Sequence, residues 1–178
     1  MYAPKPASAC LEVSENSDGC AIFVKRDRLK IVSSETVTYA LSKSEVDDGV
    51  SDVVRAMNQV GLIITCDILS QETGEVINGG QNPLVVSTTH LKAKKSEKGE
   101  RYRNREVTQL LQCIDRTMKG LNSHCQPVLV LTGDLNAAPD GRTTGYEAQA
   151  YRSVKEHALG LRSLLNDDMS VENEDDVW

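Results

Sequence analysis

The sequence predicts a mixed α/β fold in a single domain, and three stretches carry that prediction. Pro127 to Thr132 is a continuous apolar run rich in valine and leucine, which is typical of a strand buried on both faces. Val107 to Leu121 places apolar residues at spacings of three and four, which predicts a helix with one apolar stripe. Leu84 to Leu91 predicts a strand before that helix. We therefore expect a β-α-β unit whose two strands run parallel.

The chain before and after this unit predicts shorter elements. Four β-rich runs are expected to form strands: Cys20 to Val24, Leu29 to Val32, Thr36 to Leu41 and Gln59 to Leu69. The first two flank a polar turn, so we expect them to pair as a hairpin. Polar loops are expected over 42–53 and 71–82, and a second helix from Tyr146 to Leu159. No shift in composition marks a boundary, so one domain is expected over residues 1–178.

Composition limits the possible classes of protein. With 178 residues, 39% of them hydrophobic, the chain is long enough for one core. No apolar run is long enough to span a bilayer and the N-terminus lacks a signal-peptide pattern, so we expect no membrane partner. Five widely spaced cysteines without metal-binding spacing indicate reduced thiols of an intracellular protein. A cytoplasmic location is expected, with the mitochondrion and the nucleus as alternatives.

Charge is distributed unevenly along the chain. The formal net charge is -6, but the stretch from Asn166 onward holds six acids and no base, so the rest of the chain is neutral. Within that neutral part, Lys92 to Arg105 carries seven bases and two acids, a local excess of five positive charges. This positive run either forms a solvated face or attracts an anionic ligand.

Polar side chains stand at the ends of both strands of the β-α-β unit. Asp134 and Asn136 are two residues apart, so they project to the same side if the chain stays extended, and Gly133 allows another group to approach the backbone. His90 and Lys92 follow the first strand, and parallel strands end on the same side of a sheet. The alternatives are a core strand leaving into a polar turn and a histidine with only a structural hydrogen bond.

Such a group suits the hydrolysis of a phosphate ester. Asp134 would orient or deprotonate a water molecule, while Asn136, His90 and Lys92 would stabilise the phosphoryl oxygens. Lys92 and Lys94 alternate with apolar residues, so both would face the same ligand. Mg²⁺ is the electrophile we expect, because it prefers carboxylate and phosphate oxygens.

Two short motifs carry a resemblance to a known family. Thr89-His90-Leu91-Lys92-Ala93 and Gly133-Asp134-Leu135-Asn136-Ala137-Ala138-Pro139 resemble the two central motifs of the exonuclease/endonuclease/phosphatase superfamily, and in detail its nocturnin branch. Further similar blocks occur in the same order: Pro4-Lys5-Pro6, Asp18-Gly19-Cys20-Ala21-Ile22-Phe23, Asn58-Gln59-Val60, and Glu100-Arg101 with Arg103. The resemblance runs from Pro4 to about Pro139 and thins beyond Tyr146.

The resemblance implies a four-layer α/β sandwich, with two mixed sheets face to face and helices outside, and a Mg²⁺-dependent phosphoesterase. The implied substrate is the 2'-phosphate of NADP⁺ and NADPH, which would give NAD⁺ and NADH; the alternative is poly(A) RNA, degraded by a 3'-exoribonuclease in mRNA decay. By motif, Asp134 would position the water and Asn136 would hold the phosphate. The residues that would contact substrate are Lys5, Asn58, His90, Lys92 and Lys94.

Departures from the family pattern qualify these implications. Lys94 stands where the family usually has arginine, which loses a two-pronged grip on phosphate, and Leu135 replaces the usual phenylalanine. The family's metal-binding glutamate and its closing histidine have no counterpart here, so we assign no metal ligand. We expect an incomplete domain, truncated at both ends and inactive by itself, which Mg²⁺-dependent phosphate release would refute. A non-catalytic binding module is the further alternative.

Overall fold

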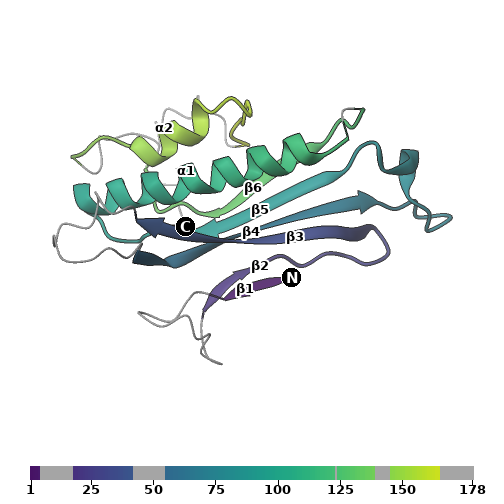
Figure 1. Ribbon diagram of the computed structural model, residues 1–178, viewed down its shortest axis with the longest axis horizontal. Helices are drawn as coiled ribbons and strands as arrows, with labels where there is room; N and C mark the ends of the chain where they lie inside the picture. Colours follow the sequence, from purple (N-terminus) through teal and green to yellow (C-terminus); the bar gives the residue numbers. More distant parts are fainter. Residues whose placement is uncertain (5–17, 42–54, 123, 139–144, 165–178) are drawn as a thin grey trace, which may run out of the picture.

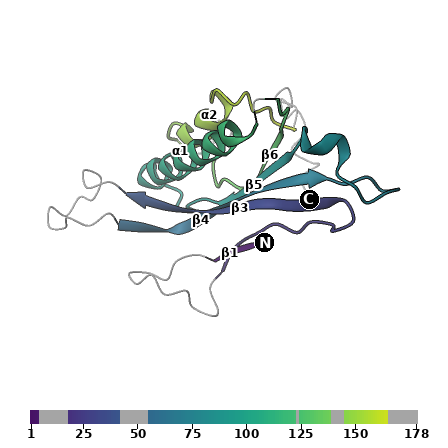
Figure 2. The same ribbon diagram turned by 45° about the vertical axis from the view of Figure 1, so that its right-hand side comes forward.

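The computed structural model describes residues 1–4, 18–41, 55–122, 124–138 and 145–164. These residues form three layers (Figure 1). Helices α1 (Glu97–Gly120) and α2 (Gln149–Lys155) cover one face of a four-stranded sheet, and a two-stranded sheet lies on its other face (Figure 2). The mixed α/β prediction is confirmed. Of the four layers that the family resemblance implies, the described residues form three, and they include no helix layer outside the small sheet. The loop predicted over 42–53 and the acidic tail lie outside them.

The four-stranded sheet contains the predicted β-α-β unit. Its order is β3 (Leu29–Leu41), β4 (Arg55–Ile68), β5 (Leu84–His90) and β6 (Val128–Asp134). β3, β4 and β5 are antiparallel neighbours, whereas β5 and β6 run parallel and are connected through α1. The parallel pairing is therefore confirmed. The loop predicted over 71–82 includes a short 3₁₀ segment, Ile77–Gly80.

The predicted hairpin of Cys20 to Val24 with Leu29 to Val32 is wrong. β2 (Gly19–Ala21) pairs with β1 (Tyr2–Pro4) in the small sheet, whereas β3 pairs with β4. A turn does form, because the Lys25 carbonyl accepts hydrogen bonds from the backbone of Arg28 and Leu29. That turn carries the chain from one sheet to the other instead of folding it back. Local sequence cannot separate these outcomes, since both need the same turn.

β3 is one strand of 13 residues where two short strands were predicted. Ser33, Ser34 and Glu35, which have weak strand propensity, pair with the buried residues Thr65, Ile64 and Ile63 of β4. A register shift between Ile31 and Ser33 accommodates the change in pattern. Pairing with a buried neighbour therefore overrides the local preference of the polar segment.

α1 begins ten residues before its predicted start. Ser96 caps it, because its Oγ accepts a hydrogen bond of 3.1 Å from the backbone N–H of Gly99, and Glu97 and Glu100 complement the helix dipole in the first turn. Gly99 is needed here because a Cβ would lie 2.0 Å from the Lys94 carbonyl oxygen. α2 is shorter than predicted. None of the described helices is long and apolar enough to cross a membrane.

The sheet has a core on each face. The helix side is filled by Val37, Tyr39, Met57, Ile63, Val85, Leu91, Val107, Leu110, Leu111, Ile114 and Ala150. The side of the small sheet is filled by Ala3, Cys20, Ile22, Val60, Leu62, Ile64 and Cys66. β4 supplies both cores by simple alternation, because its side chains point to opposite faces in turn. Cys20 and Cys66 lie in the second core, where the Cys20 thiol donates to the Val60 carbonyl and burial raises the pKa of the Cys66 thiol.

Tyr39 joins three strands through a buried hydroxyl pair. Its hydroxyl lies 2.8 Å from Oγ1 of Thr89, which donates its own hydrogen to the Val60 carbonyl at 3.1 Å. Since a threonine hydroxyl has one hydrogen to donate, Tyr39 must be the donor to Thr89. Gly61 makes room for the ring, as a Cβ there would lie 2.6 Å from the Tyr39 hydroxyl. Burial raises the pKa of Tyr39 above its ordinary value.

Replacement of Tyr39 by phenylalanine is expected to lower the free energy of unfolding by about 1 kcal/mol, because the Thr89 oxygen loses its donor. The wild type should also lose stability above about pH 10, where the unfolded tyrosine ionises and the folded one, with its raised pKa, does not. Urea unfolding at pH 8 to 11 measures both effects. Equal alkaline losses in the two proteins would contradict the pH effect.

Candidate functional site

The ends of β5 and β6 bring His90 and Asp134 together, as the sequence predicted. The two residues are paired in the parallel register, and the backbone N–H of Leu91 donates to the Asp134 carbonyl at 2.9 Å. Nε2 of His90 lies 3.8 Å from Oδ2 of Asp134, and the two side chains are 45% and 63% exposed. This distance is longer than a direct hydrogen bond, so both groups remain available to a ligand.

Asn58 shares a sheet face with His90 and Asp134. Met57 and Ile63 of β4 belong to the helix-side core, so alternation puts Asn58 on the opposite face, where it is exposed. Val86 of β5 packs in the core away from the helices, which assigns His90 to that face too. Asp134 follows by the same alternation from Leu131, which packs on the helix side. All three residues therefore lie on the face that the helices do not cover.

Gly133 and Asn136 make this convergence possible. Gly133 has a φ of +118° and packs so closely that a Cβ would lie 2.0 Å from the Thr89 carbonyl oxygen, which confirms the predicted close approach. Asn136 has a left-handed φ of 48°, and its backbone N–H donates to Oδ1 of Asp134 at 2.8 Å. Its side-chain Nδ2 donates to the Leu91 carbonyl at 3.0 Å. Asn136 thus ties together the two strand exits, a role that sequence reasoning missed.

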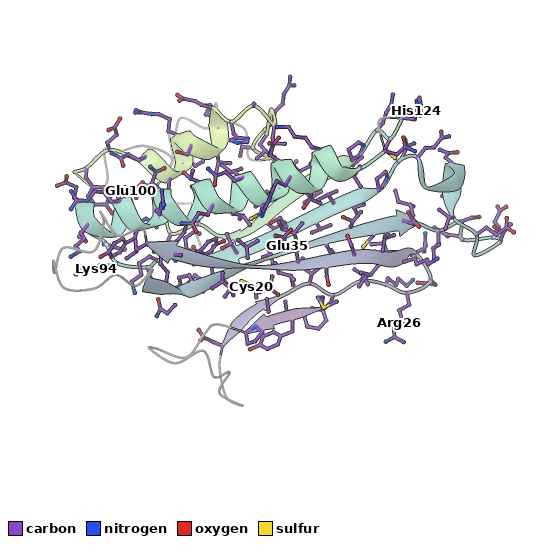
Figure 3. The ribbon with its side chains drawn as sticks, in the orientation of Figure 1. Cys20, Arg26, Glu35, Lys94, Glu100 and His124 are labelled. Atoms are coloured by element: carbon purple, nitrogen blue, oxygen red, sulfur yellow. The ribbon has the colours of Figure 1, made fainter. Side chains whose placement is uncertain are left out.

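The backbone of the loop after β5 is tied to α1. The N–H of Lys92 donates to Oε2 of Glu106 at 2.8 Å, and Nη1 of Arg103 donates to the carbonyls of Lys92 and Lys94, both at 2.8 Å. The Lys92 side chain is half-buried and that of Lys94 is exposed, near the start of α1 (Figure 3). Within the described part of the chain, neither ammonium group has an ion-pair partner. Both lysines therefore keep their charge available for an anion.

Arg103 corrects the interpretation of the positive run. Its guanidinium is 1% exposed and pairs with the Glu100 carboxylate, itself 3% exposed, at 2.7 Å. Arg103 is therefore an internal group and not part of a ligand-attracting surface. The spacing does hold a signal for this: the buried stripe of α1 extends back from Val107 by steps of four and three to Arg103 and Glu100. Lys5, predicted to contact substrate, lies outside the described residues.

The described residues do not form a site for Mg²⁺ by themselves. Asp134 supplies one carboxylate, and its Oδ1 already accepts the Asn136 N–H. No group of three or more histidine, cysteine, aspartate or glutamate side chains is placed to hold a metal ion within the described ranges. Magnesium needs about six oxygen ligands, a set that one carboxylate and a neighbouring imidazole do not approach.

Comparison with known proteins identifies the relatives of this chain. No model of a protein family matches it. Mouse nocturnin is 28% identical over 182 residues, which covers 99% of this chain, and human nocturnin has the same identity and coverage. The solved catalytic domain of human nocturnin superposes with a TM-score of 0.62 over 92% of this chain, at 28% identity. This chain is similar to nocturnin over nearly its whole length. Its α/β architecture matches the catalytic domain of that relative.

The chain corresponds to part of nocturnin only. It spans 35% of the length of the mouse and human proteins and 49% of the solved catalytic domain. Within that part, the β5–β6 pair and its two exit motifs form a continuous structure in which His90, Asp134 and Asn136 are adjacent. The arrangement offers a carboxylate, an imidazole and nearby ammonium groups at the strand-exit end of the sheet face that the helices do not cover.

Proposed function

We propose that this chain forms the phosphate-binding half of a phosphoesterase site, with the 2'-phosphate of NADP⁺ and NADPH as its ligand. The observation that carries this proposal is the parallel register that sets His90 beside Asp134. A phosphate monoester carries nearly two negative charges at neutral pH and accepts several hydrogen bonds. Lys92 and His90 supply donors of the kind that such a group needs. The solved catalytic domain of human nocturnin holds a bound sulfate anion, which has the same tetrahedral shape and charge class.

In a complete domain, the proposed reaction is the attack of water on the 2'-phosphate. The new bond joins the water oxygen to phosphorus, the bond from phosphorus to the 2'-oxygen breaks, and the 2'-oxygen takes up a proton. Inorganic phosphate and NAD⁺ or NADH are the products. Asp134 would accept a proton from the water through Oδ2, because its Oδ1 already accepts the Asn136 N–H. This Oδ2 is the oxygen that lies on the side of His90. Lys92 would stabilise the charge that builds on the phosphoryl oxygens.

The chain alone is proposed to bind without turnover. Its described residues do not assemble a metal site, and transfer of a phosphoryl group depends on strong neutralisation of developing charge. Incubation of the chain with NADP⁺ and Mg²⁺ should therefore release no inorganic phosphate above the buffer control, although NADP⁺ binds.

The test compares two ligands that differ only in the 2'-phosphate. Isothermal titration calorimetry of the full 178-residue chain should give an affinity for NADP⁺ about tenfold higher than for NAD⁺, which equals about 1.4 kcal/mol. Lys92→Met should remove most of this difference while leaving NAD⁺ binding unchanged. Lys119→Met is the matched control, because Lys119 is exposed near the C-terminal end of α1 and pairs with Asp115. It should leave both affinities unchanged.

Two outcomes would contradict the proposal. Equal affinities for NADP⁺ and NAD⁺ would show that the 2'-phosphate is not recognised. Tighter binding of an adenylate oligomer than of NADP⁺ would favour the alternative, a poly(A) exonuclease. The composition speaks against that alternative, because bases of single-stranded RNA stack on aromatic side chains and only 4% of this chain is aromatic, with one Trp, one Phe and five Tyr. The single Phe, Phe23, lies two residues after β2 and is 93% exposed.

A further inference from the structure

The buried guanidinium of Arg103 has a role that the proposed site does not yet include. Its Nε donates to Oε2 of Glu100 at 2.9 Å, Nη1 donates to the carbonyls of Lys92 and Lys94, and Nη2 donates to the Tyr146 hydroxyl at 3.1 Å. Nη2 also lies 2.7 Å from the Glu100 carboxylate. A guanidinium has five N–H donors in total; four of them make these hydrogen bonds, and the group is only 1% exposed. Arg103 cannot therefore be a ligand-binding residue.

The partners of Arg103 come from three separate segments. Glu100 belongs to the first turn of α1, the two lysine carbonyls to the loop after β5, and Tyr146 to the segment before α2. The carboxylate of Glu100 in turn accepts the backbone N–H of Ala150 in α2 at 2.8 Å. The Arg103–Glu100 pair of α1 thus connects this helix to α2 and to the loop after β5. A group with a rigid planar fork is suited to hold several acceptors at once.

The loop that Arg103 holds is the one that carries the two lysines. Lys92 is held from both sides, because its N–H donates to Glu106 and its carbonyl accepts from Arg103. The preceding residue, Leu91, is tied to Asp134 and Asn136 across the strand exits. The backbone positions of the lysines are therefore set relative to Asp134 by a continuous series of hydrogen bonds.

We propose that Arg103 is a positioning residue that fixes Lys92 and Lys94 relative to His90 and Asp134 and so sets the affinity of the site for phosphate. This inference rests on the proposed function, since it needs a phosphate ligand for its effect to be read. Lysine at position 103 keeps the charge but cannot reach two carbonyls and a carboxylate from one nitrogen. The fold should remain while the loop is released.

The experiment uses the full chain with Arg103→Lys and the control Arg116→Lys, an exposed arginine of the same helix that pairs with Glu35. Calorimetry should show that Arg103→Lys weakens NADP⁺ binding about tenfold and changes NAD⁺ binding less than about twofold. Arg116→Lys should change neither. In a Lys92→Met background, Arg103→Lys should cause less than half of its usual loss, because it acts through Lys92. Thermal unfolding of each variant checks that the protein is folded under the conditions of the titration.

Amide hydrogen exchange separates this inference from the proposed function. Arg103→Lys should speed exchange at the Lys92 amide about tenfold or more while exchange in the middle of β5 at Val86 stays unchanged. Unchanged exchange at Lys92 would overturn the inference whatever ligand the chain binds. The inference would also be overturned if Arg103→Lys weakened NADP⁺ binding in the Lys92→Met background by the same factor as in the wild type. Equal wild-type affinity for NADP⁺ and NAD⁺, with faster exchange at Lys92, would instead overturn the proposed function and leave Arg103 as a purely structural clamp.

Discussion

Replacing Gly133 with alanine is expected to destabilise the protein by about 2 to 6 kcal/mol, a large part of the roughly 5 to 15 kcal/mol by which folded domains are stable. The φ of +118° is a conformation that side chains with a Cβ rarely adopt, which costs about 1 to 3 kcal/mol. The added Cβ would also lie 2.0 Å from the Thr89 carbonyl oxygen, and relief of such an overlap costs about 1 to 3 kcal/mol more. Both costs fall on the strand pair that carries the site.

Gly120→Ala is the matched control for Gly133→Ala. A Cβ at Gly120 meets nothing within 4 Å, and the residue ends helix α1. Alanine there should raise stability by about 0.5 kcal/mol through its better helix propensity. Urea unfolding followed by circular dichroism measures both variants. A loss below about 1 kcal/mol for Gly133→Ala would mean that the close approach to Thr89 does not exist in solution.

Replacing Arg103 with methionine is expected to cost about 3 to 5 kcal/mol, because it leaves the Glu100 carboxylate buried without its partner. Three further acceptors, the carbonyls of Lys92 and Lys94 and the Tyr146 hydroxyl, lose their donor in the same change. This loss of stability differs from the positioning effect of lysine at 103, which retains the charge. Thermal and urea unfolding give the size of the effect.

A second substitution tests the cause of that loss. Glu100→Gln in the Arg103→Met background removes the buried charge but keeps an oxygen that can accept the Ala150 N–H. The double variant should therefore be more stable than Arg103→Met alone by about 1 to 2 kcal/mol. Arg116→Met, at the exposed pair with Glu35, should change stability by less than about 0.5 kcal/mol. A double variant no more stable than the single one would contradict the role of the buried charge.

The β-α-β unit could be predicted from sequence because its elements have strong, unambiguous patterns. The apolar run before Thr132 predicts only a buried strand and the stripe from Val107 only a helix, and a helix that connects two neighbouring strands favours their parallel pairing. The convergence of His90 with Asp134 followed from that topology alone. The partner of β2 could not be predicted, because the turn at Lys25 fits either a hairpin or a passage between sheets.

The start of α1 and the role of Arg103 were missed for related reasons. The first turn of α1 contains Gly99 and a run of charged residues, which give no apolar periodicity, although Ser96 caps the helix. A charged side chain is usually solvated, and burial becomes favourable only when several acceptors converge from distant segments. The acceptors of Arg103 lie between 3 and 43 residues away in sequence, which no local pattern reveals. The left-handed conformation of Asn136 could not be predicted for the same reason, because its side chain bonds to the Leu91 carbonyl, which is distant in sequence.

A second basic region of the chain serves as a reference for the proposed phosphate site. A cavity of about 550 Å³ lies at the opposite end of the four-stranded sheet, and its lining includes Arg26 and Lys30. The register places this region far from His90, since Leu29 pairs with Ile68 at that end of the sheet. An anion attracted only by positive charge should bind at both regions and not specifically at the strand exits of β5 and β6.

The measurement that tests the central claim most directly is a map of backbone amide chemical shifts as the full chain is titrated with NADP⁺, with NAD⁺ as reference. Shifts specific to NADP⁺ should centre on Leu91, Lys92 and Asn136, whose backbones frame the two strand exits. Shifts confined to Arg26 and Lys30, or identical shifts with both dinucleotides, would contradict a phosphate site between His90 and Asp134.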